Sequence, residues 1–128
     1  SMLQRRKEII EQYDAALSKE GIEVLNHYDS DHRSSGHLYI TRIPNISLEQ
    51  RQAIIEQMAE CGIATNVHYK PLPMMTAYKN LGFDIANFPN AYARFANEIT
   101  LPLHTKLTSE EIEYIIDNYI RITKQFMQ

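Results

Sequence analysis

The sequence has little cysteine, few glycines and prolines, and no long apolar run, and each shortage excludes a class of protein. Its single cysteine, Cys61, cannot form an internal disulfide, which favours a reducing cytoplasm over an extracellular location. Four glycines and five prolines are too few for a disordered or low-complexity chain. Because no signal peptide and no run of about 18 apolar residues is present, we expect a cytoplasmic protein without a membrane partner.

Basic charge is also scarce. The formal net charge is −3, and residues 5–7 are the longest basic cluster. A phosphate backbone needs a broader basic surface, so we do not expect a nucleic-acid partner. With 128 residues, 44% of them hydrophobic, the chain is long enough for a single domain, residues 1–128, and too short for two. The start Ser1-Met2 is typical of a cleaved tag, and we expect the chain to be part of a longer protein.

Three segments have the pattern of long amphipathic helices. Residues 3–19 place apolar side chains on one helical face. Ser47 begins a capping box for a second helix, which is predicted to end at Cys61, and Thr108 is the predicted N-cap of the last helix. The apolar stripes of the first and last helices are Ile9, Ile10, Tyr13, Ala16 and Leu17, and Ile112, Ile115, Ile116, Tyr119, Ile120 and Phe126.

Four shorter segments, rich in β-branched and aromatic residues, are predicted strands: 22–28, 37–43, 63–67 and 99–101. Since helices do not separate all successive strands, the predicted fold class is α+β, a small antiparallel or mixed sheet of three to four strands covered by helices. Alternation puts Leu38 and Ile40 on one face and Tyr39 on the other. We expect the helices to cover one face, and the face with Tyr39 to need a partner.

Prolines interrupt the stretch between the second and last helices. Residues 70–75 cannot be a regular helix or a central strand, because each proline removes a backbone donor and restricts the residue before it. A short helical turn is expected at residues 76–81, and Pro89 is expected to begin another helix. Three methionines are interpreted as core residues rather than as a docking surface: Met58, Met74 and Met75.

The sequence contains no complete catalytic apparatus. His27, His32 and His37 are spaced by five residues, which matches neither a zinc finger nor a helical histidine pair, so we predict no metal site. No serine or cysteine has the neighbours of a catalytic nucleophile, and no glycine-rich phosphate loop is present. We therefore assign no catalytic, cofactor-binding or metal-ligating residue to this chain.

His68 is the most informative histidine, because it follows the predicted strand 63–67 and precedes a tyrosine and two prolines. A rigid strand exit of this kind directs side chains outward, as in a binding loop. From spacing alone two interpretations stay open: His68 contacts a ligand, or backbone groups under the loop satisfy it. The same alternatives apply to His104, which also follows a predicted strand.

Several motifs occur in a recognisable order along nearly the whole chain. They are His-Leu-Tyr at 37–39, Gly-Ile-Ala-Thr-Asn-Val-His-Tyr-Lys-Pro at 62–71, Phe-Pro-Asn-Ala at 88–91 and Leu-Pro-Leu-His at 101–104. Together with Arg51, and with Thr108 and the glutamates after it, they resemble the C-terminal part of the DegT/DnrJ/EryC1/StrS family, the PLP-dependent sugar aminotransferases. Three positions depart from the family pattern, none of them in the His68 loop: Tyr92, Thr100 and Thr105.

The resemblance implies the small domain of a fold-type I aminotransferase, in which an upstream large domain, absent from this chain, binds pyridoxal 5'-phosphate. In the family the large domain supplies the Schiff-base lysine and the carboxylate for the pyridinium nitrogen. No lysine of this chain matches that lysine motif, so we expect no cofactor and no activity in this chain alone. The full-length protein is expected to be a homodimer.

The resemblance also implies a role for the His68 loop. The family's small domain closes the cleft, and this loop lies beside the mouth where a nucleotide-sugar enters. His68, Tyr69 and Lys70 are therefore the expected substrate-binding residues. The implied reaction moves an amino group from an amino acid, usually glutamate, to a nucleotide-linked keto-sugar. The alternative is a free-standing binding or dimerisation module that kept the small-domain fold without catalysis.

Overall fold

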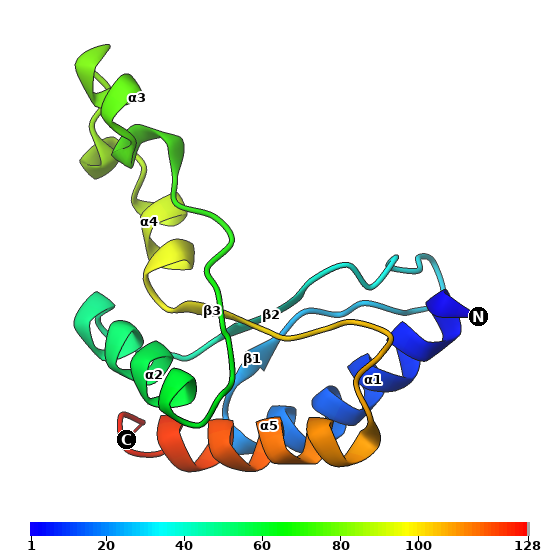
Figure 1. Cartoon of the computed structure of the whole chain (residues 1–128). Helices are drawn as coiled ribbons and strands as arrows, with labels where there is room; N and C mark the ends of the chain where they lie inside the picture. Colours follow the sequence, from blue (N-terminus) through cyan, green and yellow to red (C-terminus); the bar gives the residue numbers. More distant parts are fainter. Residues whose placement is uncertain (128) are drawn as a thin grey trace.

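The computed structural model describes residues 1–127, which form five α-helices and three strands (Figure 1). The helices are α1 (Met2–Leu17), α2 (Leu48–Glu60), α3 (Thr76–Asn80), α4 (Pro89–Ala96) and α5 (Ser109–Thr123). The strands are β1 (Glu23–Val24), β2 (Tyr39–Arg42) and β3 (Glu98–Leu101), and 3-10 turns lie at Ser18–Glu20, Leu72–Met74 and Ile85–Asn87. The predicted α+β class with a small antiparallel sheet is confirmed.

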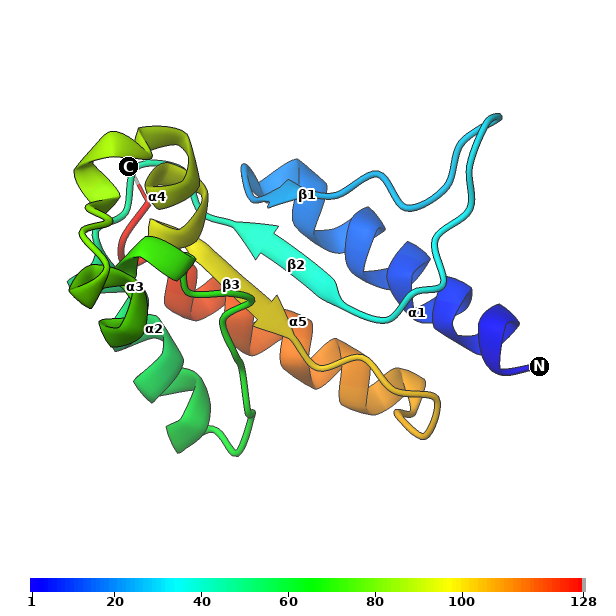
Figure 2. The same cartoon turned by 90° about the horizontal axis from the view of Figure 1, so that it is seen from above.

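The sheet has the strand order β1-β2-β3, with antiparallel pairing throughout. In its centre Tyr39 pairs with Leu101, and Thr41 pairs with Ile99. Helices α1 and α5 pack against each other and cover one face of the sheet, as the views in Figures 1 and 2 show. The core therefore lies between this face and the two helices.

The apolar stripes predicted for α1 and α5 make up most of that core. The fully buried members are Ile9, Ile10, Tyr13, Leu17, Ile112 and Tyr119, each with 0% of its surface exposed. Ile120 and Phe126, which were predicted to lie in the stripe, are only half-buried, whereas Ile122 is fully buried. The difference arises because the stripe of α5 stays on one face through Ile122, and the chain turns away after Thr123.

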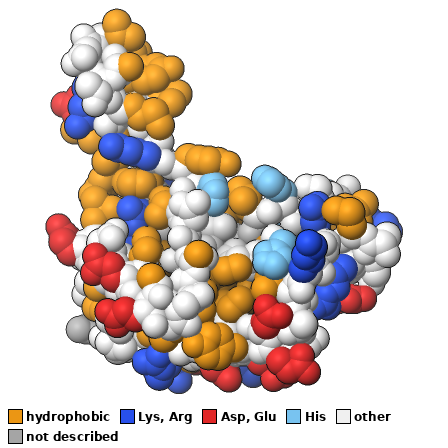
Figure 3. Space-filling model, in the orientation of Figure 1, with side chains coloured by type: hydrophobic (Ala, Val, Ile, Leu, Met, Phe, Trp, Pro, Cys, Tyr) orange, Lys and Arg blue, Asp and Glu red, His pale blue; other side chains and the backbone are white. Residues whose placement is uncertain are grey.

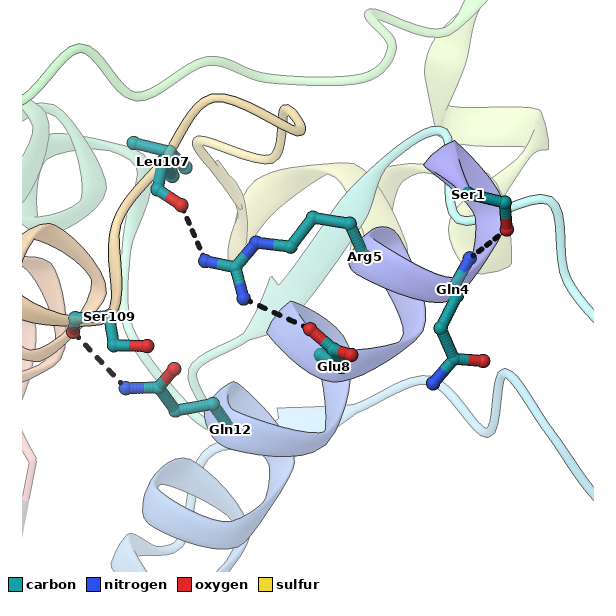
Figure 4. A network of polar contacts seen from close by, with 7 residues as sticks. All are labelled: Ser1, Gln4, Arg5, Glu8, Gln12, Leu107 and Ser109. Atoms are coloured by element: carbon teal, nitrogen blue, oxygen red, sulfur yellow. Dashed lines mark hydrogen bonds and ion pairs between the residues drawn. The ribbon is translucent and has the colours of Figure 1, made fainter.

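Polar contacts join α1 to the start of α5 (Figure 4). The Arg5 guanidinium donates to the Leu107 carbonyl oxygen at 2.5 Å, and the Gln12 amide donates to the Ser109 carbonyl oxygen at 3.3 Å. Both carbonyls belong to the turn that precedes and opens α5. These contacts fix the position of that turn, and with it the strand exit after β3.

The face of β2 that carries Tyr39 is the covered face, so the expectation that it needs a partner is wrong. Tyr39 has no exposed surface, and its hydroxyl donates to Asp14 Oδ1 at 2.6 Å. Thr41, on the same face, is bonded to Tyr119. Polar side chains can face the core here because α1 and α5 supply a partner for each hydroxyl. Leu38 and Ile40 lie on the opposite face and are half-buried.

Two predicted strands are much shorter than expected. The segment 22–28 contributes only β1, Glu23–Val24. The segment 63–67 contains no strand and makes a single antiparallel bridge, Asn66 with Thr100. Its ladder stops there because the next N–H on the side of β3, that of His68, donates to the Glu98 side-chain Oε2 at 2.8 Å instead of to a backbone carbonyl.

The predicted helix boundaries are confirmed where the sequence supplies a cap. The Ser47 side chain accepts from the Gln50 N–H, and the Gln50 side chain accepts from the Ser47 N–H, a complete capping box. The Thr108 hydroxyl accepts from the Glu111 N–H at 3.1 Å. Pro89 stands at the start of α4, as predicted.

Residues 71–88, here called the arm, project from the body of the domain (Figures 1 and 3). Met58 is a core residue as predicted, but Met74 is half-buried and Met75 is 38% exposed. The interpretation of Met75 as a core residue is wrong, because the arm has no layer packed over it. Large apolar side chains remain exposed along its length: Leu72, Met75, Tyr78, Leu81, Phe83 and Phe88.

Among residues 1–127, no helix combines the length and the apolar character that crossing a bilayer requires.

Candidate substrate-binding site

The loop that carries His68, Tyr69 and Lys70 begins at the free edge of β3. Asn66 and Thr100 exchange two backbone hydrogen bonds, with N to O distances of 3.1 and 2.7 Å. The chain then leaves the edge, passes through a cis peptide bond between His68 and Tyr69, and continues into the arm. Figure 1 shows this path from the end of α2 past β3. The edge of the sheet thus sets where the loop starts.

A buried carboxylate anchors the first residue of the loop. Glu98, at the start of β3, is only 1% exposed. Its Oε2 accepts the backbone N–H of His68 at 2.8 Å, and its Oε1 accepts the Thr100 hydroxyl at 2.5 Å. The Thr100 oxygen in turn lies 2.9 Å from His68 Nδ1. Both the backbone and the ring of His68 are therefore held by side chains of one strand.

Arg51 on α2 carries a positive charge that interacts electrostatically with this carboxylate. The side chain is buried, its guanidinium lies 4.4 Å from the centre of the Phe95 ring, and it donates to the Phe95 carbonyl oxygen. Burial lowers the pKa of Arg51, and the negative charge of Glu98 opposes that shift. Each charge thus reduces the free energy that burial of the other requires.

Tyr69 and Lys70 differ from His68 in having their side chains exposed. Tyr69 is 71% exposed, and its ring packs edge-on against the His68 ring, with centroids 4.7 Å apart. Lys70 is also exposed. The loop therefore combines one anchored imidazole, one exposed phenol and one exposed ammonium, groups able to bind hydroxyls, a base ring and phosphate respectively.

A hollow of about 190 Å3 lies beside the His68 ring. Its polar wall is formed by His37, Asn66, His68 and Thr100, and Leu103 is among its apolar residues. His104 lies instead on a larger apolar groove of about 540 Å3, which includes Tyr114 and Ile115 of α5. Figure 3 shows histidine side chains gathered on this side of the molecule. The structure brings His68 together with β3, but it does not bring His104 into the same hollow.

The second interpretation left open for His68, satisfaction of its ring by backbone groups, does not describe the site. The ring is bonded to a side chain, Thr100, rather than to a carbonyl. Sequence reasoning did not identify Glu98 or Thr100 as part of the site. The signal that could have found them is a glutamate at the start of an otherwise uncharged strand, where burial requires a partner. His27, by contrast, is a buried residue bonded to Ser34 and stacked on Tyr39.

Solved structures provide close matches to the whole chain. Spr1654 from Streptococcus pneumoniae, a provisionally assigned sugar aminotransferase, matches in its PLP form with a TM-score of 0.96 and 54% identity. The match covers 100% of this chain and 33% of that one. PseC from Helicobacter pylori, an aminotransferase of pseudaminic acid biosynthesis, matches with a TM-score of 0.87 and 28% identity over 98% of this chain and 33% of its own. Spr1654 is also known in a PMP form.

The lysines of this chain do not fit the site of such a cofactor. A lysine that forms a Schiff base is typically desolvated in a pocket. None of the six described lysines is buried: Lys7, Lys19, Lys70, Lys79, Lys106 and Lys124. The least exposed, Lys7, pairs with Glu11 at 3.9 Å and lies over the Tyr28 ring. No step that involves the cofactor is therefore assigned to residues of this chain.

Sequence comparison agrees with the structural matches. The spore coat polysaccharide biosynthesis protein SpsC of Bacillus subtilis is 26% identical over 126 residues, which are 96% of this chain and 32% of SpsC. The chain thus spans about a third of the length of the relatives it matches. The sequence model of one family matches residues 1–119. The chain belongs to the DegT/DnrJ/EryC1/StrS aminotransferase family.

Proposed function

We propose that this chain is the C-terminal small domain of a PLP-dependent aminotransferase that acts on a nucleotide-linked keto-sugar. One observation carries the proposal: nearly the whole chain superposes on a third of Spr1654, a provisionally assigned sugar aminotransferase that binds PLP. The amino donor is an amino acid, with glutamate the expected one. The enzyme works in the cytoplasm, and the cofactor is bound by the large domain, outside this chain.

In this function His68, Tyr69 and Lys70 contact the sugar nucleotide. The support is chemical: the anchored His68 ring can hydrogen-bond a hydroxyl, and the exposed Tyr69 ring can stack on a base or bond a phosphate. The Lys70 ammonium is a mobile positive charge, which suits a phosphate. The His68→Ala enzyme should have an altered KM or kcat. Unchanged values of both would show that His68 does not contact the substrate and has only a structural role.

The arm is proposed to pack on the large domain of the same protein. Leu81 is 74% exposed and Leu72 is 53% exposed. Exposure of this much apolar surface to water is unfavourable, so such a surface is typically covered by another domain or partner. The relatives are about three times as long as this chain, so they contain a large domain able to cover it. The complete enzyme is proposed to be a homodimer.

The test compares this chain with the longer protein. Each is mixed with PLP, glutamate and a set of nucleotide-linked keto-sugars, and 2-oxoglutarate is measured. The longer protein should show aldimine absorbance, and it should release more than one equivalent of 2-oxoglutarate per bound cofactor only when a keto-sugar is present, whereas this chain should do neither. If the longer protein also shows neither aldimine absorbance nor 2-oxoglutarate release, the alternative of a binding module without catalysis describes this domain better. Aldimine absorbance on this chain would contradict the assignment of the cofactor lysine to the large domain.

A further inference from the structure

Three atoms form a hydrogen-bond chain from β3 to the candidate site. Glu98 Oε1 lies 2.5 Å from Thr100 Oγ1, which lies 2.9 Å from His68 Nδ1. A threonine hydroxyl has one proton to donate and can accept at its lone pairs. An ionised carboxylate can only accept. The Thr100 proton therefore goes to Glu98, and Thr100 can bond His68 only by accepting a proton from Nδ1.

The direction of these two hydrogen bonds depends on the ionisation of Glu98. A protonated carboxyl could donate to Thr100, and Thr100 could then donate to His68. Three features favour the carboxylate. Its second oxygen accepts the His68 N–H at 2.8 Å. The guanidinium of Arg51 is close enough for the Glu98 charge to oppose the lowering of the Arg51 pKa by burial. Finally, 2.5 Å is the length typical of a charge-assisted O–H···O⁻ bond.

A fixed proton on Nδ1 determines what the other ring nitrogen can do. In a neutral imidazole one nitrogen carries the proton and the other accepts. No described residue hydrogen-bonds His68 Nε2, and this atom is not among the buried polar atoms without a partner. The ring also lines the hollow of about 190 Å3 beside β3. Nε2 is thus an accessible acceptor at a hollow with both polar and apolar walls.

We propose that Glu98 and Thr100 are positioning residues that hold His68 in the Nδ1–H tautomer, so that Nε2 accepts a hydrogen bond from a ligand hydroxyl. The identification of that hydroxyl with one on the sugar rests on the proposed function. The tautomer itself depends only on contacts within this chain. Free neutral histidine in water favours the opposite tautomer, with the proton on Nε2. The tautomer expected from the hydrogen bonds of His68 therefore differs from the one expected of a histidine in contact only with water.

The first test is NMR of the 15N-labelled 128-residue chain. Long-range 1H–15N correlation spectra report which nitrogen of each histidine carries the proton, and the His68 signals are those lost in His68→Gln. At a pH where the ring is neutral, His68 should carry its proton on Nδ1. A predominant Nε2–H form in the unmodified chain would overturn the proposal, whatever any variant does.

Two variants of Thr100 separate positioning from general stability. Thr100→Ser keeps the hydroxyl and should keep the Nδ1–H tautomer. Thr100→Val has nearly the same shape without the hydroxyl and should move His68 towards the Nε2–H form. The His27 signals serve as an internal control, because His27 is buried and bonded to Ser34. An unchanged His68 tautomer in Thr100→Val, with His27 signals as in the parent chain, would overturn the role of Thr100.

The second test concerns the ligand and uses the longer enzyme. Loss of a well-placed acceptor should raise KM for the keto-sugar nucleotide by roughly tenfold in Thr100→Val, and Thr100→Ser should restore most of it. An unchanged KM would overturn the assignment of a ligand hydroxyl to Nε2. Because the NMR measurement needs neither substrate nor cofactor, failure of the proposed function and failure of the proposed tautomer are distinguishable.

Discussion

Thr41 Oγ1 and the hydroxyl oxygen of Tyr119 lie 2.6 Å apart in the core, where β2 meets α5. The Thr41 proton goes to the Ile99 carbonyl oxygen, 2.7 Å away, so Tyr119 is the donor of the shared bond. Both residues are fully buried. Burial also raises the pKa of Tyr119 above its usual range, which keeps the phenol protonated as a donor. This pair links the sheet that carries the site to the helix that supports it.

Tyr119→Phe should therefore lower the free energy of unfolding by about 1 kcal/mol, the net contribution of one buried hydrogen bond. The loss is limited because Thr41 keeps its bond to Ile99. Urea denaturation followed by circular dichroism measures it. Tyr114→Phe is the matched control, since Tyr114 is 51% exposed and its hydroxyl donates to the Cys61 carbonyl oxygen. An equal loss in both variants would contradict the argument from burial.

Thr108→Ala should cost about 1 kcal/mol, because it removes the side-chain acceptor for the Glu111 N–H at the start of α5. The neighbouring Ser109→Ala changes an exposed residue inside the helix and should have little effect. Thermal unfolding of the two variants under one set of conditions makes the comparison. If both melt like the parent chain, the Thr108 cap does not stabilise α5.

His27 should make the domain less stable as the pH falls. Burial lowers the pKa of His27, and Asp14 opposes the shift only partly, so the folded state holds the ring neutral. The unfolded chain then binds the proton more readily, and the stability is present above the ordinary pKa of about 6.5 and is lost as the pH falls below it.

The measurement is the free energy of unfolding between about pH 7.5 and pH 5 for the parent chain and for His27→Gln. The variant loses the stacking on Tyr39, so its absolute stability should also change. The informative quantity is the slope with pH, which should be smaller in the variant. A slope that is the same in both proteins would assign the pH dependence to other groups.

Leu81→Ser tests the arm in two settings. In this chain Leu81 is 74% exposed, so the substitution should change the free energy of unfolding by no more than about 0.5 kcal/mol. In the longer protein the same change should lower the melting temperature by about 2 °C or more, because the residue is proposed to be covered there. Leu25→Ser, at an exposed position outside the arm, is the control. Amide exchange of residues 71–88 that is equally fast in both proteins would argue against docking.

The elements with local signals could be predicted from the sequence, and those without them could not. The stripe in α1 and the caps at Ser47 and Thr108 follow from side chains within one or two turns, and the structure contains each of them. The segment 63–67 has the composition of a strand, yet its pairing ends after Asn66. Strand formation depends on an available partner edge and free donors, neither of which composition reports.

The sequence by itself determined the family, the helices and the identity of the loop at His68, because ordered motifs and helical periodicity are properties of neighbouring residues. Only the tertiary structure decided which face of β2 is covered, since Tyr39 and Thr41 face the core through partners on α1 and α5. It also decided what His68 contacts. Glu98 lies 30 residues away along the chain, and folding alone brings its buried carboxylate to the start of the loop.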